Sequence, residues 1–244
     1  MSNLYGDMSA MIVVGHRGVA GHFPENSKAS ILAAIELGLE WVEVDIQPTF
    51  DNVLVVCHDH TVDRCSNGSG RIDELTLKQL KELDFGRWFD TEFAGQSIMT
   101  LEELLQLAQE NNLKLNLEVK IDRHDAQAVC ELVKQTLDKA EINKDNILLS
   151  SFSADVIRHL HLLLPDYRLG VLSERLTGKV KALLREVDAF SCNLNHLWTN
   201  KKHVATLQAE GYQVWCYTVN NPRRLKHLSN LDAIFSDFPA RFLP

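Results

Sequence analysis

The second half of the chain alternates between two hydrophobic patterns. Short apolar runs typical of β-strands are separated by longer segments in which apolar residues recur every three or four positions, as on one face of an α-helix. The pattern predicts strands at 115–120, 147–152, 168–172, 189–194, 213–219 and 233–236, and helices at 100–111, 125–140, 154–164, 178–186, 201–210 and from Asn221-Pro222 onward. Because strand and helix alternate, we expect a parallel sheet covered by helices.

The first 60 residues are less regular. A strand is expected at the apolar run 11–14, which ends at Gly-His-Arg-Gly (15–18). Ser27 can cap a helix at 28–39. Strands are expected at 41–47 and 54–59, and the turn between them is too short to hold a helix, which indicates an antiparallel hairpin. The total is then nine strands. We assign the strand at 54–59 as the extra one, because it has no crossover helix of its own.

The remaining eight strands fit a TIM-type (β/α)8 barrel. The chain has 244 residues, and such barrels reach about 250 residues as one domain. We therefore expect a single catalytic domain over residues 1–244. Residues 61–98 are rich in glycine and polar side chains, with one short helix near 76–83, and are expected to form a small insertion after the strand that leads to His58.

Composition and charge narrow the classes of function. Lys and Arg number 25 against 33 Asp and Glu, a net charge of −8, and the basic residues are scattered, which argues against nucleic acid as a partner. No apolar segment approaches the roughly 18 residues of a membrane span, so no stable membrane insertion is expected.

The N-terminus and the cysteines bear on the compartment. Residues 1–10 lack a basic start and a long apolar segment, so no signal peptide is expected. The five cysteines are odd in number and widely spaced, as for reduced thiols rather than disulfides. We expect a cytoplasmic protein, and the sequence leaves open whether it is a monomer or a homo-oligomer.

The strand at 41–47 carries two acids on one face. Side chains alternate across a strand, so Val42, Val44 and Ile46 share one face while Glu43 and Asp45 share the other. In a half-exposed antiparallel strand the polar face would meet water. In a barrel wrapped by helices it must point inward.

Two inward carboxylates need a positive charge beside them. If their oxygens approach to about 5 Å, repulsion at an effective dielectric near 20 is about 3 kcal/mol, enough to raise the pKa of one carboxyl by roughly two. An isolated acidic pair is more often solvent-exposed, but Glu118 repeats the inward pattern on the strand at 115–120. A divalent cation, or the side chains of Arg17 and Lys120, would balance these charges, and oxygen ligands favour Mg²⁺ or Ca²⁺ over zinc.

His16 and His58 are the candidate acid/base groups. A single histidine at a strand end is more often a structural residue, but folding the hairpin brings His58 beside Asp45, so two histidines converge on the acids. His16 and Arg17 can face one phosphate only if the first strand ends at His16, in a turn that Gly15 and Gly18 permit.

These motifs together resemble the glycerophosphodiester phosphodiesterases. The residues that carry the resemblance, in chain order, are His16-Arg17-Gly18, Pro24-Glu25-Asn26-Ser27, Glu43-x-Asp45, His58-Asp59 with Arg64, Glu118-x-Lys120, Ser151-Phe152, Trp215-x-x-Thr218-x-Asn220 and Ser236-Asp237-x-Pro239. Ser27 and Ser236 stand where the family commonly has threonine, and both keep the hydroxyl. The resemblance implies a β/α barrel with an insertion after the His58 strand.

The resemblance also implies the roles of five residues. Glu43, Asp45 and Glu118 would hold one divalent metal ion, and His16 and His58 would be the catalytic pair. The implied reaction is metal-assisted hydrolysis of a small-molecule glycerophosphodiester, such as glycerophosphocholine or glycerophosphoethanolamine, to sn-glycerol 3-phosphate and an alcohol. We favour His16 as the base and His58 as the acid.

Arg17 and Lys120 are the implied phosphate-binding residues, although each could also be an ordinary salt-bridge partner. Trp215 is as consistent with a core residue as with a wall of the substrate pocket. The sequence leaves open the headgroup preference, the metal, the order of the two histidines, and whether water or the glycerol 2-hydroxyl attacks first.

The sequence leaves two other functions to compare with this one. A related barrel phospholipase, of phosphoinositide or sphingomyelinase D type, would act on lipid vesicles, and the chain has no evident apolar interfacial helix. A non-catalytic binding barrel should have lost a metal ligand or a histidine, and none is missing.

Overall fold

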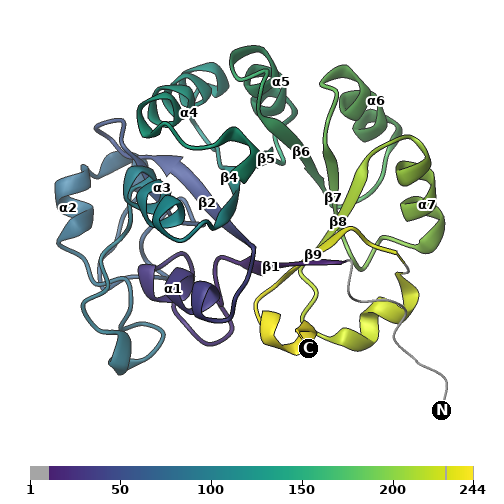
Figure 1. The fold of residues 1–244 in the computed structure, drawn as a ribbon. Coiled ribbons are helices and arrows are strands. Elements are labelled where there is room, and N and C mark those ends of the chain that lie inside the picture. Colours follow the sequence, from purple (N-terminus) through teal and green to yellow (C-terminus); the bar gives the residue numbers. More distant parts are fainter. Residues whose placement is uncertain (1–10, 229, 244) are drawn as a thin grey trace.

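Eight of the nine predicted strands form a closed parallel barrel in the computed structural model, which describes residues 11–228 and 230–243. The expectation of no signal peptide concerns residues 1–10 and lies outside this part of the chain. Neighbouring strands pair around the ring, and β1 pairs with both β2 and β9, which closes it (Figure 1). The predicted TIM-type (β/α)8 barrel is confirmed.

The strands agree closely with the hydrophobic pattern. They are β1 Ile12–His16, β2 Trp41–Pro48, β3 Leu54–Val56, β4 Lys114–Val119, β5 Ile147–Ser151, β6 Arg168–Ser173, β7 Ser191–Asn195, β8 Gln213–Tyr217 and β9 Ala233–Ser236. As predicted, β3 is the extra strand: it pairs antiparallel with the end of β2, outside the ring.

Helices surround the barrel, with α2 set further out (Figure 1). They are α1 Lys28–Glu36, α2 Leu77–Lys81, α3 Leu101–Glu110, α4 Ala126–Ala140, α5 Ala154–Leu163, α6 Gly178–Glu186 and α7 Lys201–Ala209. Each begins after a polar residue whose side chain accepts a backbone hydrogen bond, and the predicted capping box of α3 is present at Thr100 and Glu103. Caps of this kind explain why the starts of the helices could be read from the sequence.

Several elements are shorter than predicted, including α1, which ends at Glu36, and β8, which ends at Tyr217. The helix expected after Asn221 is a 3₁₀ helix, Pro222–His227, because the chain must return within a few residues to β9. The strand expected at 54–59 ends at Val56, because the Gln47 side-chain amide donates hydrogen bonds to the carbonyls of Cys57 and Asp59, both at 2.8 Å.

The two faces of the barrel strands have different surroundings. Outward side chains such as Val42, Val44 and Ile46 are fully buried beneath the helices in the main hydrophobic core. Inward side chains further from the carboxyl ends of the strands form a separate apolar cluster that includes Trp41 and Trp215. Above this cluster the inward positions become polar, so the core supports a polar site at the carboxyl ends of the strands.

Residues 61–98 connect β3 to α3 beside the barrel. Their apolar side chains, together with Val55 and Cys57, form a second hydrophobic cluster that includes Ile72, Leu80 and Phe85. The insertion boundaries and the single-domain interpretation stay predictions.

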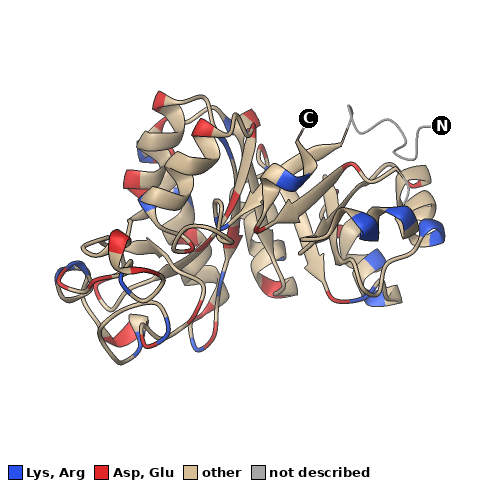
Figure 2. Cartoon of the chain, turned by 90° about the horizontal axis from the view of Figure 1, so that it is seen from below, with Lys and Arg blue, Asp and Glu red and all other residues tan. Residues whose placement is uncertain are grey.

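Both signs of charge occur on the outer helices and loops. Figure 2 shows Asp and Glu among Lys and Arg on the left of the view, whereas the helices on the right carry mainly Lys and Arg. Within residues 11–228 and 230–243, no helix combines the length and the apolar character needed to cross a membrane.

Candidate active site

A pocket opens among the carboxyl ends of the barrel strands. Six of the eight predicted site residues line it, and Asp45 and Trp215 do not. The lining residues are His16, Arg17, Glu43, His58, Asn116, Glu118, Lys120, Phe152, Leu172, Tyr217, Thr218 and Phe235. Charged and polar groups come mainly from β1, β2, β4 and the loop after β3, whereas Phe152, Leu172, Tyr217 and Phe235 form a more apolar side.

The strand β1 ends at His16, as the geometric argument required. Arg17 and Gly18 both have positive φ angles, 51° and 86°, so the chain turns immediately after the histidine. A side chain at Gly15 would place a Cβ atom 2.4 Å from the Gly18 carbonyl oxygen, so only glycine fits there. Arg17 rather than a glycine takes the first left-handed position, and its backbone N–H donates to a Glu43 carboxylate oxygen at 3.1 Å.

Glu43, Asp45 and Glu118 come together inside the barrel. Asp45 and Glu118 are direct neighbours in the register of β2 and β4. Each of the three residues is buried and offers a carboxylate oxygen, and these oxygens lie within 4.8 Å of one another. The Glu43 Oε1 atom is buried without a hydrogen-bond partner. A divalent cation would satisfy this oxygen, and an all-carboxylate donor set fits Mg²⁺ or Ca²⁺.

The three acids differ in their electrostatic surroundings. Burial, and then the nearby charge of Asp45, raise the pKa of Glu43 to about 8 and also raise that of Glu118. Burial opposes the charge of Asp45 as well, but Arg17 and Lys120 hold its pKa below the ordinary value. Repulsion between the carboxylates therefore raises the pKa of Glu43 and Glu118, as expected. Burial raises these pKa values more, and strand periodicity alone did not predict that contribution.

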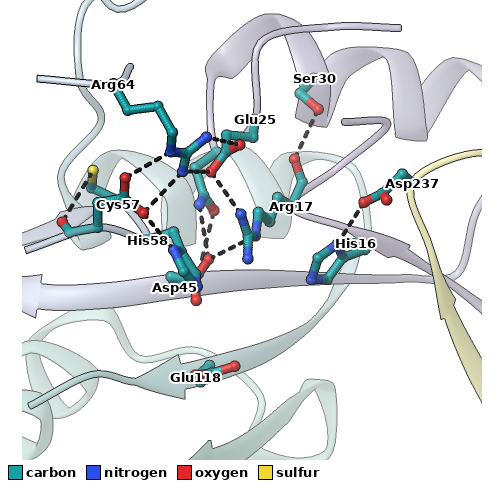
Figure 3. Close-up of polar contacts among 12 residues, drawn as sticks. His16, Arg17, Glu25, Ser30, Asp45, Cys57, His58, Arg64, Glu118 and Asp237 are labelled. Atoms are coloured by element: carbon teal, nitrogen blue, oxygen red, sulfur yellow. Dashed lines mark hydrogen bonds and ion pairs between the residues drawn. The ribbon is translucent and has the colours of Figure 1, made fainter. Parts of the chain in front are cut away.

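Two cations lie against the acids. The Arg17 guanidinium donates to Glu25 at 2.7 Å and lies 3.2 Å from an Asp45 oxygen (Figure 3). The Lys120 ammonium lies 2.9 Å from Glu118 and 3.6 Å from Asp45. Burial works against the charge of Lys120, but Glu118 and Asp45 raise its pKa. Both side chains thus stay charged at the pocket, where an anion could reach them.

His16 is oriented by a carboxylate from across the barrel closure. Its Nδ1 atom lies 2.6 Å from Asp237 Oδ1, just after β9, and its Nε2 atom lies 3.8 Å from a Glu43 oxygen. Asn220 donates to the other Asp237 oxygen at 2.6 Å. Although burial favours the neutral imidazole, Asp237 and Glu43 raise the pKa of His16.

His58 is oriented by its own neighbour. Its Nδ1 atom lies 2.7 Å from Asp59 Oδ1, and Arg64 binds both oxygens of Asp59 and both of Glu25 (Figure 3). The Cys57 amide donates to the Asp45 carbonyl at 2.9 Å, which brings His58 to the level of Asp45 as predicted. Burial lowers the pKa of His58.

Of the two interpretations that the sequence left open for Trp215, a core residue and a wall of the substrate pocket, its position in the structure fits the core residue. Its side chain is fully buried among Trp41, Phe190 and Phe235, and it does not line the pocket. Its indole N–H donates to Gln213 at 2.8 Å. Trp215 belongs to the apolar cluster below the pocket, and Tyr217, two residues later on β8, lines the pocket instead.

Several residues of the site were not assigned a role from the sequence. Asp237, Asp59 and Glu25 stood in the motifs but carried no predicted function. Asn26 also contributes, because its side chain donates to Asp45 at 2.9 Å. Asn116 is fully buried in the pocket floor, and its position on the polar face of the strand beside Glu118 was the only signal for it.

Comparisons with known proteins now decide the family. The sequence profile of the glycerophosphoryl diester phosphodiesterase family matches residues 16–241. The chain belongs to this family.

Named relatives agree with that assignment. The chain is 30% identical over 234 residues to a glycerophosphodiester phosphodiesterase of Bacillus altitudinis, covering 94% of this chain and 95% of the relative. It is also 30% identical over 233 residues to one from Caldanaerobacter subterraneus, with 93% and 94% covered. The chain is thus an enzyme with glycerophosphodiester phosphodiesterase activity.

A solved structure of similar fold comes from Oleispira antarctica. It is a phosphodiesterase in complex with the product sn-glycerol 3-phosphate, 28% identical to this chain, with a TM-score of 0.90 and 96% of each chain covered. The predicted family and barrel are therefore confirmed together.

Proposed function

We propose that this pocket hydrolyses soluble glycerophosphodiesters, such as glycerophosphocholine and glycerophosphoethanolamine, to sn-glycerol 3-phosphate and an alcohol. The observation that carries the proposal is the pair of carboxylate-bound imidazoles, His16 and His58, beside three buried carboxylates in one pocket. The product bound by the Oleispira antarctica phosphodiesterase supports the glycerol phosphate half of this assignment.

Glu43, Asp45 and Glu118 would hold one divalent cation, Mg²⁺ or Ca²⁺. When bound there, such an ion supplies positive charge that polarises phosphoryl oxygens. Arg17 and Lys120 extend that positive region with side chains that can donate hydrogen bonds to the phosphate oxygens. Their existing ion pairs with Glu25 and Glu118 fix where those donors lie before substrate binds.

The two histidines transfer the protons. Each uses Nδ1 to bind a carboxylate, which leaves Nε2 as the atom that exchanges a proton with the substrate. We assign His16 as the base and His58 as the acid. The support is exposure: 33% of the His58 side chain is exposed against 18% for His16, so His58 is the imidazole that a departing alcohol and solvent reach more easily.

The cytoplasmic location is part of the same proposal. All five cysteines are unpaired and buried, which suits a reducing compartment. Burial raises the pKa of the Cys57 thiol well above its ordinary value, so this residue close to the pocket stays protonated and is not a candidate nucleophile.

The experiment is a product assay by ³¹P nuclear magnetic resonance on a panel of glycerophosphodiesters. We expect sn-glycerol 3-phosphate from the panel, no turnover with a chelator, and recovery when Mg²⁺, Ca²⁺ or Mn²⁺ is added back. Full activity in the chelated protein would contradict metal assistance. Cleavage of lipid vesicles without cleavage of soluble diesters would favour the phospholipase alternative, and binding without turnover at any divalent ion would favour a non-catalytic barrel.

A further inference from the structure

The apolar side of the pocket carries an acidic residue at its rim. Glu174 follows β6 and is exposed, and one of its carboxylate oxygens lies 3.5 Å from the Tyr217 hydroxyl. Tyr217 lines the pocket and packs edge-on against Phe152, with ring centroids 5.7 Å apart. Phe152 also lines the pocket and is 49% exposed. These three side chains form a continuous surface from the pocket to solvent, which we call the Glu174 rim.

Within the described part of the chain, Glu174 forms no ion pair with a cation of its own loop. The donors that the structure gives it are neutral: the Asn195 amide at 2.8 Å and the Tyr217 hydroxyl. The adjacent Arg175 places its guanidinium over the Trp198 ring, 3.9 Å from the ring centroid. The rim therefore presents a carboxylate and two aromatic rings, the combination that attracts an organic ammonium ion.

We propose that the Glu174 rim binds the alcohol half of the substrate and selects alcohols that carry an ammonium group. This inference rests on the proposed function. Arg17 and Lys120 lie on the other side of the pocket, so its two sides differ in charge as the two ends of a zwitterionic diester do. In glycerophosphocholine the glycerol is neutral and the ammonium is two carbons from the phosphoester oxygen. With the phosphate at Arg17 and Lys120, the ammonium is the group that Glu174 attracts.

The test compares kcat/KM for glycerophosphocholine with kcat/KM for glycerophosphoglycerol, whose alcohol is neutral. We expect the wild type to favour glycerophosphocholine, and Glu174→Gln to reduce that ratio about threefold to tenfold. The amide of glutamine can still accept from Asn195 and Tyr217, so the change removes the charge and keeps the contacts. Phe152→Leu should reduce the ratio too, and rising ionic strength should reduce it in the wild type but not in Glu174→Gln.

Glu102→Gln is the matched control, since it removes an exposed carboxylate from α3, outside the barrel. We expect it to leave the ratio unchanged. An equal loss for both diesters in Glu174→Gln would mean that Glu174 only positions Tyr217, and an unchanged ratio would mean that it does not meet the substrate; either result overturns the inference. If the wild type cleaves neither diester, the proposed function itself is wrong and the inference fails with it.

Discussion

His16 and His58 serve one pocket but are held by different parts of the molecule. His16 ends β1, and its partner Asp237 follows β9, the strand paired with β1, so the closure of the barrel places both groups. His58 follows the short strand β3, and its partner Asp59 is held by Arg64 from the loop beyond. One imidazole is positioned by the sheet, the other by ion pairs between loops.

The difference shows how each half of the site can be disturbed. A change near His16 acts on the barrel itself, where the Asn220 side chain donates to the Asp237 carboxylate and accepts from the Asp237 backbone and the Ser236 hydroxyl. A change near His58 acts on a network that ends in solvent, because the Arg64 side chain is 44% exposed.

Removal of either imidazole should cost the most. We expect His16→Ala and His58→Ala each to lower kcat on glycerophosphocholine by about 10² to 10⁴, because each removes one proton-transfer step. His227→Ala, at the exposed end of the 3₁₀ helix Pro222–His227, is the control and should turn over normally. Near-normal rates for both pocket variants would show that the two histidines are not the acid/base pair.

Loss of the orienting carboxylates should come next. Asp237→Asn and Asp59→Asn are each expected to lower kcat by about 10², because an amide can donate to Nδ1 and favour the wrong imidazole tautomer. The effect should appear in kcat more than in KM, since neither carboxylate is placed to touch the phosphate. An effect confined to KM would instead mean that these carboxylates act on substrate binding.

The loop network can be weakened without touching either histidine. Arg64→Gln removes the bonds to Asp59 and Glu25, and we expect kcat to fall about threefold to tenfold, a modest loss because the ion pairs are partly solvated. Arg123→Gln is the matched control, since Arg123 binds Asp73 and Glu74 at the surface. Equal losses in the two variants would remove the special role of Arg64.

The smallest effect is a difference in titration between the two imidazoles. In the protein without divalent ions, nuclear magnetic resonance should show His16 titrating above the ordinary pKa of 6.5 and His58 below it. The signs for stability are then opposite. The contribution of His16 is present below pH 6.5 and is lost as the pH rises through its folded pKa, whereas that of His58 is present above pH 6.5 and is lost as the pH falls through its folded pKa.

Unfolding midpoints measured against pH provide the second readout. Relative to wild type, a His16→Gln variant should lose stability mainly at low pH and a His58→Gln variant mainly at high pH. The same pH dependence in both variants would contradict the difference in their surroundings.

The barrel and its acids could be predicted because both depend on local periodicity. Strict alternation in β2 placed Glu43 and Asp45 inside once a helix-covered barrel was inferred, and Glu118 followed in β4 by the same rule. The end of β1 at His16 also followed, because two neighbouring side chains of a regular strand cannot share a target. Each of these conclusions needed only a few adjacent residues.

Contacts between distant segments could not be predicted in this way. The partner of His16 lies 221 residues away and is recognised only when β9 is placed beside β1. The two interpretations of Trp215 stayed open for a related reason: periodicity gives the inward direction of a side chain but not its depth in the barrel. Depth is set by the stagger of the strands, which one strand does not reveal.

The most direct test of the account is a change of leaving group in the two histidine variants. A glycerol phosphodiester of p-nitrophenol needs little help from an acid, because nitrophenolate departs without a proton. We predict that the loss of activity caused by His58→Ala is smaller on this ester than on glycerophosphocholine by about tenfold or more. The loss caused by His16→Ala should be the same on both substrates. Recovery by His16→Ala alone would reverse the two roles, and equal behaviour of both variants would contradict a division of acid and base between them.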